Sequence, residues 1–316
     1  MQADGFLHEL KDFPELIRAV SHERHIHPQL IEKDYWIMHV LYGLDQQGFI
    51  FELKGGTSLS KGYRVIERFS EDIDIRIEPP AELHVMSGKN HQKFAHVESR
   101  RHFFDWLAET IRMPGIERTE RDSSFDDDQF RSAGIRLIYP SAFQTMPGLK
   151  PGILLEVGFD DTAPNEAVDI SSWALEKAAA AGVNFIDNRA RGVKCYHPAY
   201  TLVEKLQAVS TKFRQQQQSG GFPVNFLQHY YDIYCLLDEP RVQTFIGTEA
   251  YEKRKAQRFR QGDVRRIADN EAFVMRDSTV LAQYKAQYAK TEGLYYSGMV
   301  PFQAILDRIQ QYFDRL

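Results

Sequence analysis

The sequence predicts an α+β protein in which a mixed sheet flanked by helices is followed by a helical C-terminal part. Two observations support this fold class. Short segments with strand-like alternation recur between helical stretches in the first part of the chain, and from residue 198 onward every periodic segment has helical spacing. The predicted strands are residues 51–54, 72–77, 117–121, 134–139 and 153–159. We therefore expect a sheet-containing domain over residues 1–196 and a helical bundle domain over residues 197–316.

The composition is that of an ordinary globular protein. The chain has 316 residues, of which 43% are hydrophobic and 26% are charged. No apolar run approaches the length of a membrane span, and Cys195 and Cys235 imply no disulfide framework, so we expect a cytoplasmic protein with no membrane partner. The net charge of −5 argues against general coating of nucleic acid, so any RNA contact must come from a local basic patch.

A glycine turn follows the first predicted strand. The residues are Gly55-Gly56-Thr57-Ser58, and a short helix is predicted over residues 59–65. A glycine turn that opens a helix presents free backbone N–H groups to an anion. The turn is therefore a candidate phosphate-binding element.

The next predicted strand, residues 72–77, carries two carboxylates on one face. Its strict alternation places Asp72 and Asp74 on one side and three isoleucines on the other. Like charges on one strand face repel each other and lose hydration, so the pair is best explained by a cation between them. An anion-binding turn beside such a site is the chemistry of a nucleoside triphosphate with Mg²⁺ or Mn²⁺. The alternative is an ordinary hairpin with a solvated acidic strand.

These motifs also carry a family resemblance. Gly-Gly-Thr-Ser followed by Ser-Glu-Asp-Ile-Asp resembles the signature of the DNA-polymerase-β-like nucleotidyltransferases. The fuller string LKGGTSLSKGY…RFSEDIDI is similar to the AbiEii/AbiGii-type toxins, a branch that includes the MenT toxins. The resemblance implies a polymerase-β-like mixed sheet, a nucleoside triphosphate substrate, pyrophosphate release, and phosphate binding by Gly55, Gly56, Thr57 and Ser58.

A third acid lies on the predicted strand 153–159. Glu156 shares one face with Leu154 and Gly158, and a single carboxylate in apolar surroundings is unfavourable to bury without a partner. Polymerase-β-like enzymes take their third metal-site acid from a neighbouring strand, so the resemblance implies that Glu156 completes the metal site. The alternative is a glutamate at a strand edge that faces water.

The helical part supplies two further motifs. Residues 200–208 resemble the lysine-bearing helix of the toxin family, and residues 230–234 resemble its later aspartate motif. The resemblance implies that Lys205 reaches across the domain cleft to the triphosphate and that Asp232 orients Lys205 or the metal shell. The arginine that usually precedes this aspartate is absent here. The alternatives are a lysine that extends to water along an apolar stripe and a surface ion pair at Asp232.

The sequence leaves the roles of two charged segments undecided. Glu32-Lys33-Asp34 resembles another segment of the toxin family, but equally suits the solvated face of a packed helix. The densest basic stretch runs from Lys253 to Arg266. Phe259 lies within it, and Tyr251 lies just before it. It is either a phosphate track for RNA or a solvated helix face balanced by neighbouring acids.

The resemblance implies the toxin component of a toxin–antitoxin system, with nucleotides transferred from a nucleoside triphosphate to an acceptor. The implied acceptor is the tRNA 3′ end, and the implied partner is a cognate antitoxin protein. Two other readings remain open: a nucleotide-binding regulator without turnover, and a nucleotidyltransferase that acts on a protein or small molecule.

Overall fold

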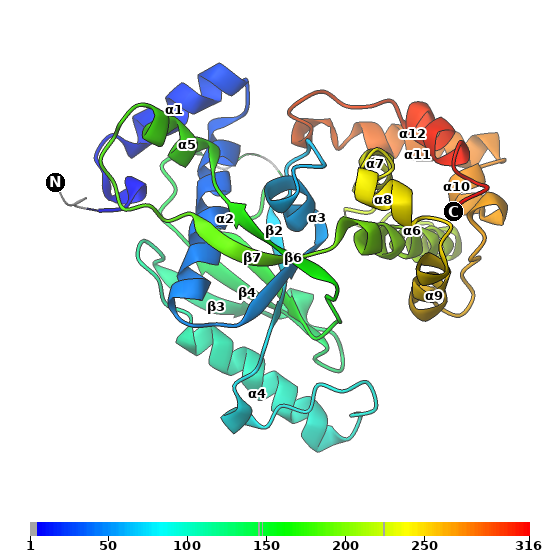
Figure 1. The fold of residues 1–316 in the computed structure, drawn as a ribbon, viewed down its shortest axis with the longest axis horizontal. Coiled ribbons are helices and arrows are strands. Elements are labelled where there is room, and N and C mark those ends of the chain that lie inside the picture. The colour runs from blue at the N-terminus through cyan, green and yellow to red at the C-terminus, as the bar shows by residue number, and fades with distance from the viewer. Residues whose placement is uncertain (1–4, 145, 147, 224) are drawn as a thin grey trace. The chain divides into compact units, whose positions relative to one another are not determined.

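The computed structural model describes residues 5–144, 146, 148–223 and 225–316, and it confirms the predicted α+β class. The described residues form one seven-stranded mixed sheet in the order β3-β4-β5-β2-β1-β7-β6 (Figure 1). The strands are β1 (Phe51–Lys54), β2 (Asp72–Ile77), β3 (Arg118–Asp122), β4 (Ser132–Ile138), β5 (Ile153–Gly158), β6 (Asn165–Ile170) and β7 (Ala190–Tyr196).

Helices precede, interrupt and follow this sheet. In the sheet-containing part they are α1 (Phe13–Arg24), α2 (Pro28–Gln46), α3 (Gly55–Thr57), α4 (Phe94–Thr110) and α5 (Trp173–Ala180), with a π-helical turn η2 (Ser58–Gly62) and short 3₁₀ turns at Leu7–Glu9, Ala81–Leu83 and Ser123–Phe125. The later helices are α6 (Pro198–Ser219), α7 (Gln228–Leu236), α8 (Pro240–Phe245), α9 (Glu249–Arg258), α10 (Glu271–Val274), α11 (Ser278–Ala289) and α12 (Phe302–Gln310), with 3₁₀ turns at Ile267–Asp269 and Glu292–Leu294.

The chain divides into two compact units. Unit 1 contains residues 1–62 and 70–196, and unit 2 contains residues 197–316 together with residues 63–69. This short excursion is tied into unit 2 because Phe69 N–H donates to Leu294 O at 2.8 Å and Arg68 pairs with Tyr295 in a β-bridge. The sequence did not predict that residues 63–69 would belong to the helical part.

The centre of the sheet explains the alternation of β2. This strand pairs antiparallel with β1 and parallel with β5. Ile73, Ile75 and Ile77 are fully buried on one face, while the aspartates on the other face are half-buried. Helix α2 packs against β5 and β7, and α4 packs against β3 and β4.

The hairpin of β6 and β7 was not predicted. β7 pairs parallel with β1 and antiparallel with β6, so the sheet contains two strands more than the sequence predicted. β6 is an outer strand with only Ile170 buried, and β7 has alternation interrupted by Gly192 at positive φ. Neither strand has a clear period of two, and their pairing depends on distant residues.

Unit 2 has a helical core of its own. Helix α6 packs against α7 and α9, and α7 also packs against α12. Large aromatic side chains fill the interior, and Tyr230, Tyr251 and Tyr284 are fully buried. None of the described helices is both long enough and apolar enough to span a lipid bilayer.

Candidate active site

The three predicted acids meet on one face of the sheet in unit 1. Asp74 on β2 lies directly opposite Glu156 on β5, and Asp72 is two residues earlier on the same face of β2. All three side chains are half-buried. On the other side of β2, Asp74 is paired with Lys54, which immediately precedes the glycine turn. The sheet register therefore brings the carboxylates together beside that turn.

A lysine that the sequence did not predict also contacts this group. Lys150 Nζ donates to Asp72 Oδ2 at 2.6 Å. The other oxygen, Asp72 Oδ1, is buried and has no hydrogen-bond partner among the described residues. An ammonium thus satisfies one side of the Asp72 carboxylate and leaves the other open to a further donor or ion.

The chemistry of these residues fits a divalent cation. Carboxylate oxygens are the preferred ligands of Mg²⁺, and the buried Asp72 Oδ1 is an unused ligand. Within the described part of the chain, however, no three His, Cys, Asp or Glu side chains are already grouped as a metal-binding set.

Burial and mutual repulsion disturb the titration of the acids. Burial, reinforced by the charges of Asp74 and Asp72, raises the pKa of Glu156 to about 8. Burial also raises the pKa of Asp72, although the hydrogen bond and charge of Lys150 oppose this change. A cation placed among the carboxylates relieves both effects, since it favours their ionised forms.

The glycine turn fits tightly against this group. Gly55 has a φ of +72°, and a Cβ at this position would overlap the Asp74 carboxylate. The Thr57 hydroxyl donates to Asp72 O, and the Ser58 hydroxyl donates to Gly55 O at 2.9 Å. Both hydroxyl-bearing residues are fully buried; Thr57 holds the turn against β2, and Ser58 closes a hydrogen bond within the turn. Phosphate binding by these hydroxyls requires them to exchange their present acceptors.

In unit 2, Asp232 on α7 is the centre of a buried ion-pair cluster. Arg68 forms a bidentate ion pair with it: Nε donates to Oδ1 at 2.7 Å, and Nη2 donates to Oδ2 at 2.8 Å. Lys205 Nζ on α6 lies 2.9 Å from Asp232 Oδ2. Burial alone would raise the pKa of Asp232, but the charges of Arg68 and Lys205 hold it below its usual range.

These contacts exclude both alternatives left open for Lys205 and Asp232. Asp232 is fully buried and Lys205 is 7% exposed, so neither a surface ion pair nor a lysine extended to water describes them. Arg68, which lies 164 residues from Asp232 in sequence, supplies a guanidinium to an aspartate whose local motif lacks its usual arginine. The sequence signal for Arg68 is only its place in the string RFSEDIDI, which carries the family resemblance.

Comparison with known proteins identifies the family. The family model for the nucleotidyl transferase AbiEii toxin of type IV toxin–antitoxin systems matches residues 39–308. This range includes the glycine turn, all three acids, Lys205 and Asp232.

The chain belongs to the AbiEii family.

It is therefore a nucleotidyltransferase of a toxin family, and membership implies a nucleoside triphosphate substrate and an antitoxin partner. No curated protein shows significant similarity to the chain. Among solved structures it is similar to an antigenic nucleotidyltransferase-like protein from Paracoccidioides brasiliensis, with 13% identity and a TM-score of 0.35. That similarity covers 87% of this chain and 96% of the other.

The segment Glu32-Lys33-Asp34, which precedes the residues matched by the family model, lies inside the protein. All three residues are about 1% exposed, so the solvated-face interpretation is wrong. Glu32 accepts hydrogen bonds from Ser141 Oγ and, at 2.9 Å, from Ala142 N–H. These contacts fix the start of the loop that leads to β5.

Lys33 and Asp34 secure two other elements of unit 1. Lys33 Nζ donates to Lys150 O at 2.7 Å and to Glu71 Oε2 at 3.1 Å. Asp34 accepts from Lys61 and, at 2.9 Å, from Trp173 N–H at the start of α5. The segment therefore has a positioning role, because it fixes the loop carrying Lys150 and the turn that follows the glycines.

Part of the basic segment considered as an RNA track is held in contacts within unit 2, whereas Lys253, Arg260, Arg265 and Arg266 are exposed. Arg254 and Arg258 are paired with Glu204, at 2.8 and 2.6 Å. Lys255 is buried and donates to the Leu316 carbonyl. Tyr251 and Phe259 are also buried, so they belong to the core of unit 2 and cannot stack on bases.

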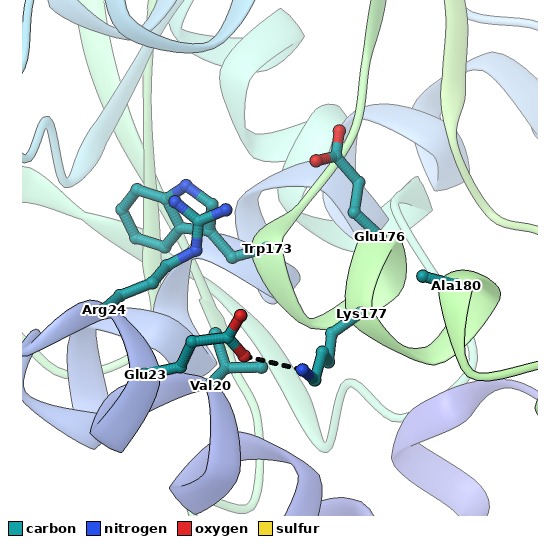
Figure 2. A pocket seen from close by; sticks show the side chains of 7 residues that line it. All are labelled: Val20, Glu23, Arg24, Trp173, Glu176, Lys177 and Ala180. Atoms are coloured by element: carbon teal, nitrogen blue, oxygen red, sulfur yellow. Dashed lines mark hydrogen bonds and ion pairs between the residues drawn. The ribbon is translucent and has the colours of Figure 1, made fainter.

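A surface pocket elsewhere in unit 1 contains none of the predicted site residues. Figure 2 shows it between α1 and α5, lined by residues that include Arg24, Trp173 and Ala180. The volume of the pocket is about 240 Å³. Lys177 Nζ and Glu23 Oε2 form an ion pair at 2.7 Å across it. The Arg24 guanidinium already lies over the Trp173 ring, at 5.6 Å from its centroid.

The first testable consequence is a pH dependence of metal-free stability. The pKa of Glu156 rises from 4.5 to about 8 on folding, so between these values the folded protein holds a proton that the unfolded chain has lost. The free energy of unfolding should therefore fall as the pH rises from about 5 to 8. Glu156→Gln should flatten this dependence, measured as the unfolding temperature at several pH values. Glu117→Gln, at an exposed carboxylate of unit 1, is the control, and an equally steep profile in both variants would contradict the assignment.

The second consequence concerns the glycine turn. Gly55→Ala should destabilise unit 1 by more than about 2 kcal/mol, because it adds a clash with Asp74 to the roughly 1–2 kcal/mol of an unfavourable positive φ. Gly192→Ala is a matched control, since Gly192 has a φ of +62° but open space around its Cβ position. Urea denaturation followed by tryptophan fluorescence measures the difference. Equal losses in the two variants would show that Asp74 does not restrict this turn.

Proposed function

We propose that the protein is a metal-dependent nucleotidyltransferase that adds nucleotides to the 3′ end of tRNA. The observation that carries this proposal is the placement of Asp72, Asp74 and Glu156 on one sheet face beside a glycine turn, in a chain of the AbiEii family. In the proposed reaction a hydroxyl oxygen of the acceptor attacks the α-phosphorus in line. The new bond joins this oxygen to the α-phosphorus, and the bond from the α-phosphorus to the oxygen that bridges to the β-phosphorus breaks. Pyrophosphate leaves, and the hydroxyl group loses its proton.

The three acids have distinct proposed roles. Asp72 and Asp74 would hold Mg²⁺ or Mn²⁺, and Glu156 would complete the site near the attacking hydroxyl. When bound, such ions neutralise charge that develops on the phosphates and orient the reacting oxygens. Because burial and the neighbouring aspartates raise the pKa of Glu156 to about 8, its carboxyl group would give up a proton on becoming a ligand.

Cationic and backbone groups would bind the triphosphate. Gly55 and Gly56 have no side chain between their backbone and a bound phosphate, and Thr57 and Ser58 complete the turn. Lys205 is proposed to contact a phosphate oxygen as a compact cation. Asp232 would orient Lys205, and their 2.9 Å contact within unit 2 supports this role.

The acceptor and the partner are proposed from the family. Members of the toxin branch that the sequence resembles act on tRNA acceptor ends, and the toxin–antitoxin description of the family supports a cognate antitoxin protein. A cytoplasmic location is proposed with them, because tRNA is found there. The buried, paired state of Arg254 and Lys255 directs the search for an RNA-binding surface to other residues.

The test is a labelling experiment. Purified protein is incubated with each α-labelled nucleoside triphosphate in turn, Mg²⁺ or Mn²⁺, and total bacterial RNA. We expect label in RNA of tRNA size, and none when the RNA is first oxidised with periodate to destroy its 3′ hydroxyl groups. Label in protein or in a small molecule would replace tRNA with another acceptor. Nucleotide binding without any transfer would support a regulator instead.

A further inference from the structure

Lys150 is held in place by its backbone as well as by its side chain. Its N–H donates to Glu71 Oε2 at 3.0 Å, and its carbonyl accepts from Lys33 Nζ at 2.7 Å. Lys33 and Glu71 are themselves paired at 3.1 Å, and Lys33 is about 1% exposed. The position of this loop is therefore fixed by contacts that do not involve the Lys150 ammonium.

The ammonium is directed at the carboxylate group. Besides its 2.6 Å contact with Asp72, it lies 4.9 Å from the centroid of the Phe125 ring. The side chains of Lys150 and Asp72 are only 23% and 13% exposed, so the pair is largely shielded from water. At this range and burial a unit charge interacts strongly with a carboxylate, whereas an exposed pair would be screened.

The electrostatic effect of Lys150 extends beyond Asp72. Burial and the two aspartates raise the pKa of Glu156, and the charge of Lys150 opposes this change. Lys150 thus acts on two of the three acids in the way expected of a bound cation. It also takes one Asp72 oxygen that an ion would otherwise use, while the described acids are not yet grouped around a metal position.

We propose that Lys150 is an internal counter-ion of this carboxylate group, which holds Asp72 in the metal-free protein and is displaced from it when a divalent cation binds. The inference rests on the proposed function, because it concerns the same acids. It means that part of the negative charge of the site is neutralised without metal, and that part of the attraction for the metal is offset by loss of the Lys150 contact. After displacement, the ammonium remains beside the site on its fixed backbone.

The direct test is Mn²⁺ binding without nucleotide, measured from the electron paramagnetic resonance signal of free Mn²⁺. Lys150→Met should bind Mn²⁺ about tenfold more tightly than the unaltered protein, because the competing charge is gone. Lys150→Arg keeps the charge and should bind like the unaltered protein. Lys177→Met, at an exposed lysine of unit 1, controls for a general change in charge. Asp72→Asn with Asp74→Asn should abolish the binding.

Thermal unfolding supplies a second measurement. Without metal at about pH 8, Lys150→Met should unfold at a lower temperature than the unaltered protein, and Mn²⁺ should restore more of its stability. The backbone contacts with Glu71 and Lys33 survive this substitution, and Lys150→Gln, which keeps a hydrogen-bond donor but no charge, serves if Lys150→Met does not fold. Mn²⁺ affinity that is unchanged or weaker in the uncharged variants would overturn the proposal. If the labelling experiment fails but Lys150→Met binds Mn²⁺ more tightly, the proposed transfer to tRNA is rejected. The proposal that Lys150 is a counter-ion of the carboxylates is then still supported.

Discussion

Nucleotide transfer should fall by about a thousandfold or more when Asp72 and Asp74 are both replaced by asparagine. The two side chains share one face of β2 with Glu156 opposite Asp74, and their replacement removes the charges proposed to hold the metal. Losses of this order follow removal of groups that neutralise a transferring phosphoryl group. The measurement is incorporation of labelled nucleotide into RNA under conditions that saturate the unaltered protein.

The double variant should remain folded. Asparagine has nearly the same shape, repulsion with Glu156 decreases, and Lys150 loses its charged partner, so the effects on stability oppose each other. Circular dichroism and the unfolding temperature check this. Asp128→Asn, at an exposed aspartate of the same unit, should transfer nucleotides normally. Substantial transfer by a well-folded Asp72→Asn and Asp74→Asn protein would rule out these residues as the metal ligands.

The largest expected effect on stability is at Asp232. Asp232→Ala should destabilise unit 2 by about 3–5 kcal/mol, because it leaves Arg68 and Lys205 buried without a counter-charge. The three tryptophans, Trp36, Trp106 and Trp173, all lie in unit 1. Urea unfolding can therefore be followed separately by tryptophan fluorescence for unit 1 and by the circular dichroism of the helices, which report strongly on unit 2.

Two further variants separate charge burial from a general loss of packing. Asp238→Ala removes an exposed aspartate that pairs with Arg308 in the same unit, and it should change stability by less than about 1 kcal/mol. Adding Arg68→Met to Asp232→Ala should recover part of the lost stability, since one unpaired buried charge is then removed. If Asp232→Ala were no more destabilising than Asp238→Ala, the buried cluster would not stabilise unit 2.

The sequence alone determined the local chemistry of this protein. The alternation of residues 72–77 placed two aspartates on one strand face, and β2 has those bounds because three isoleucines on the opposite face fill the core. The sequence also predicted a glycine turn at residues 55–58, and the positive φ of Gly55 found in the structure suits a glycine there. Such features depend on a few adjacent residues, so the sequence shows their period and residue types directly. The order of the motifs along the chain also showed which family the sequence resembles.

Only the tertiary structure revealed the partners of these residues. Lys150 is 78 residues from Asp72 and Arg68 is 164 residues from Asp232, and no local pattern links either pair. The same holds for the unpredicted hairpin of β6 and β7, and for the burial of Glu32-Lys33-Asp34. The physical reason is that the energy of a buried charge is set by what packs around it. A sequence shows which residues are charged, whereas the folded chain determines which of them neutralise one another.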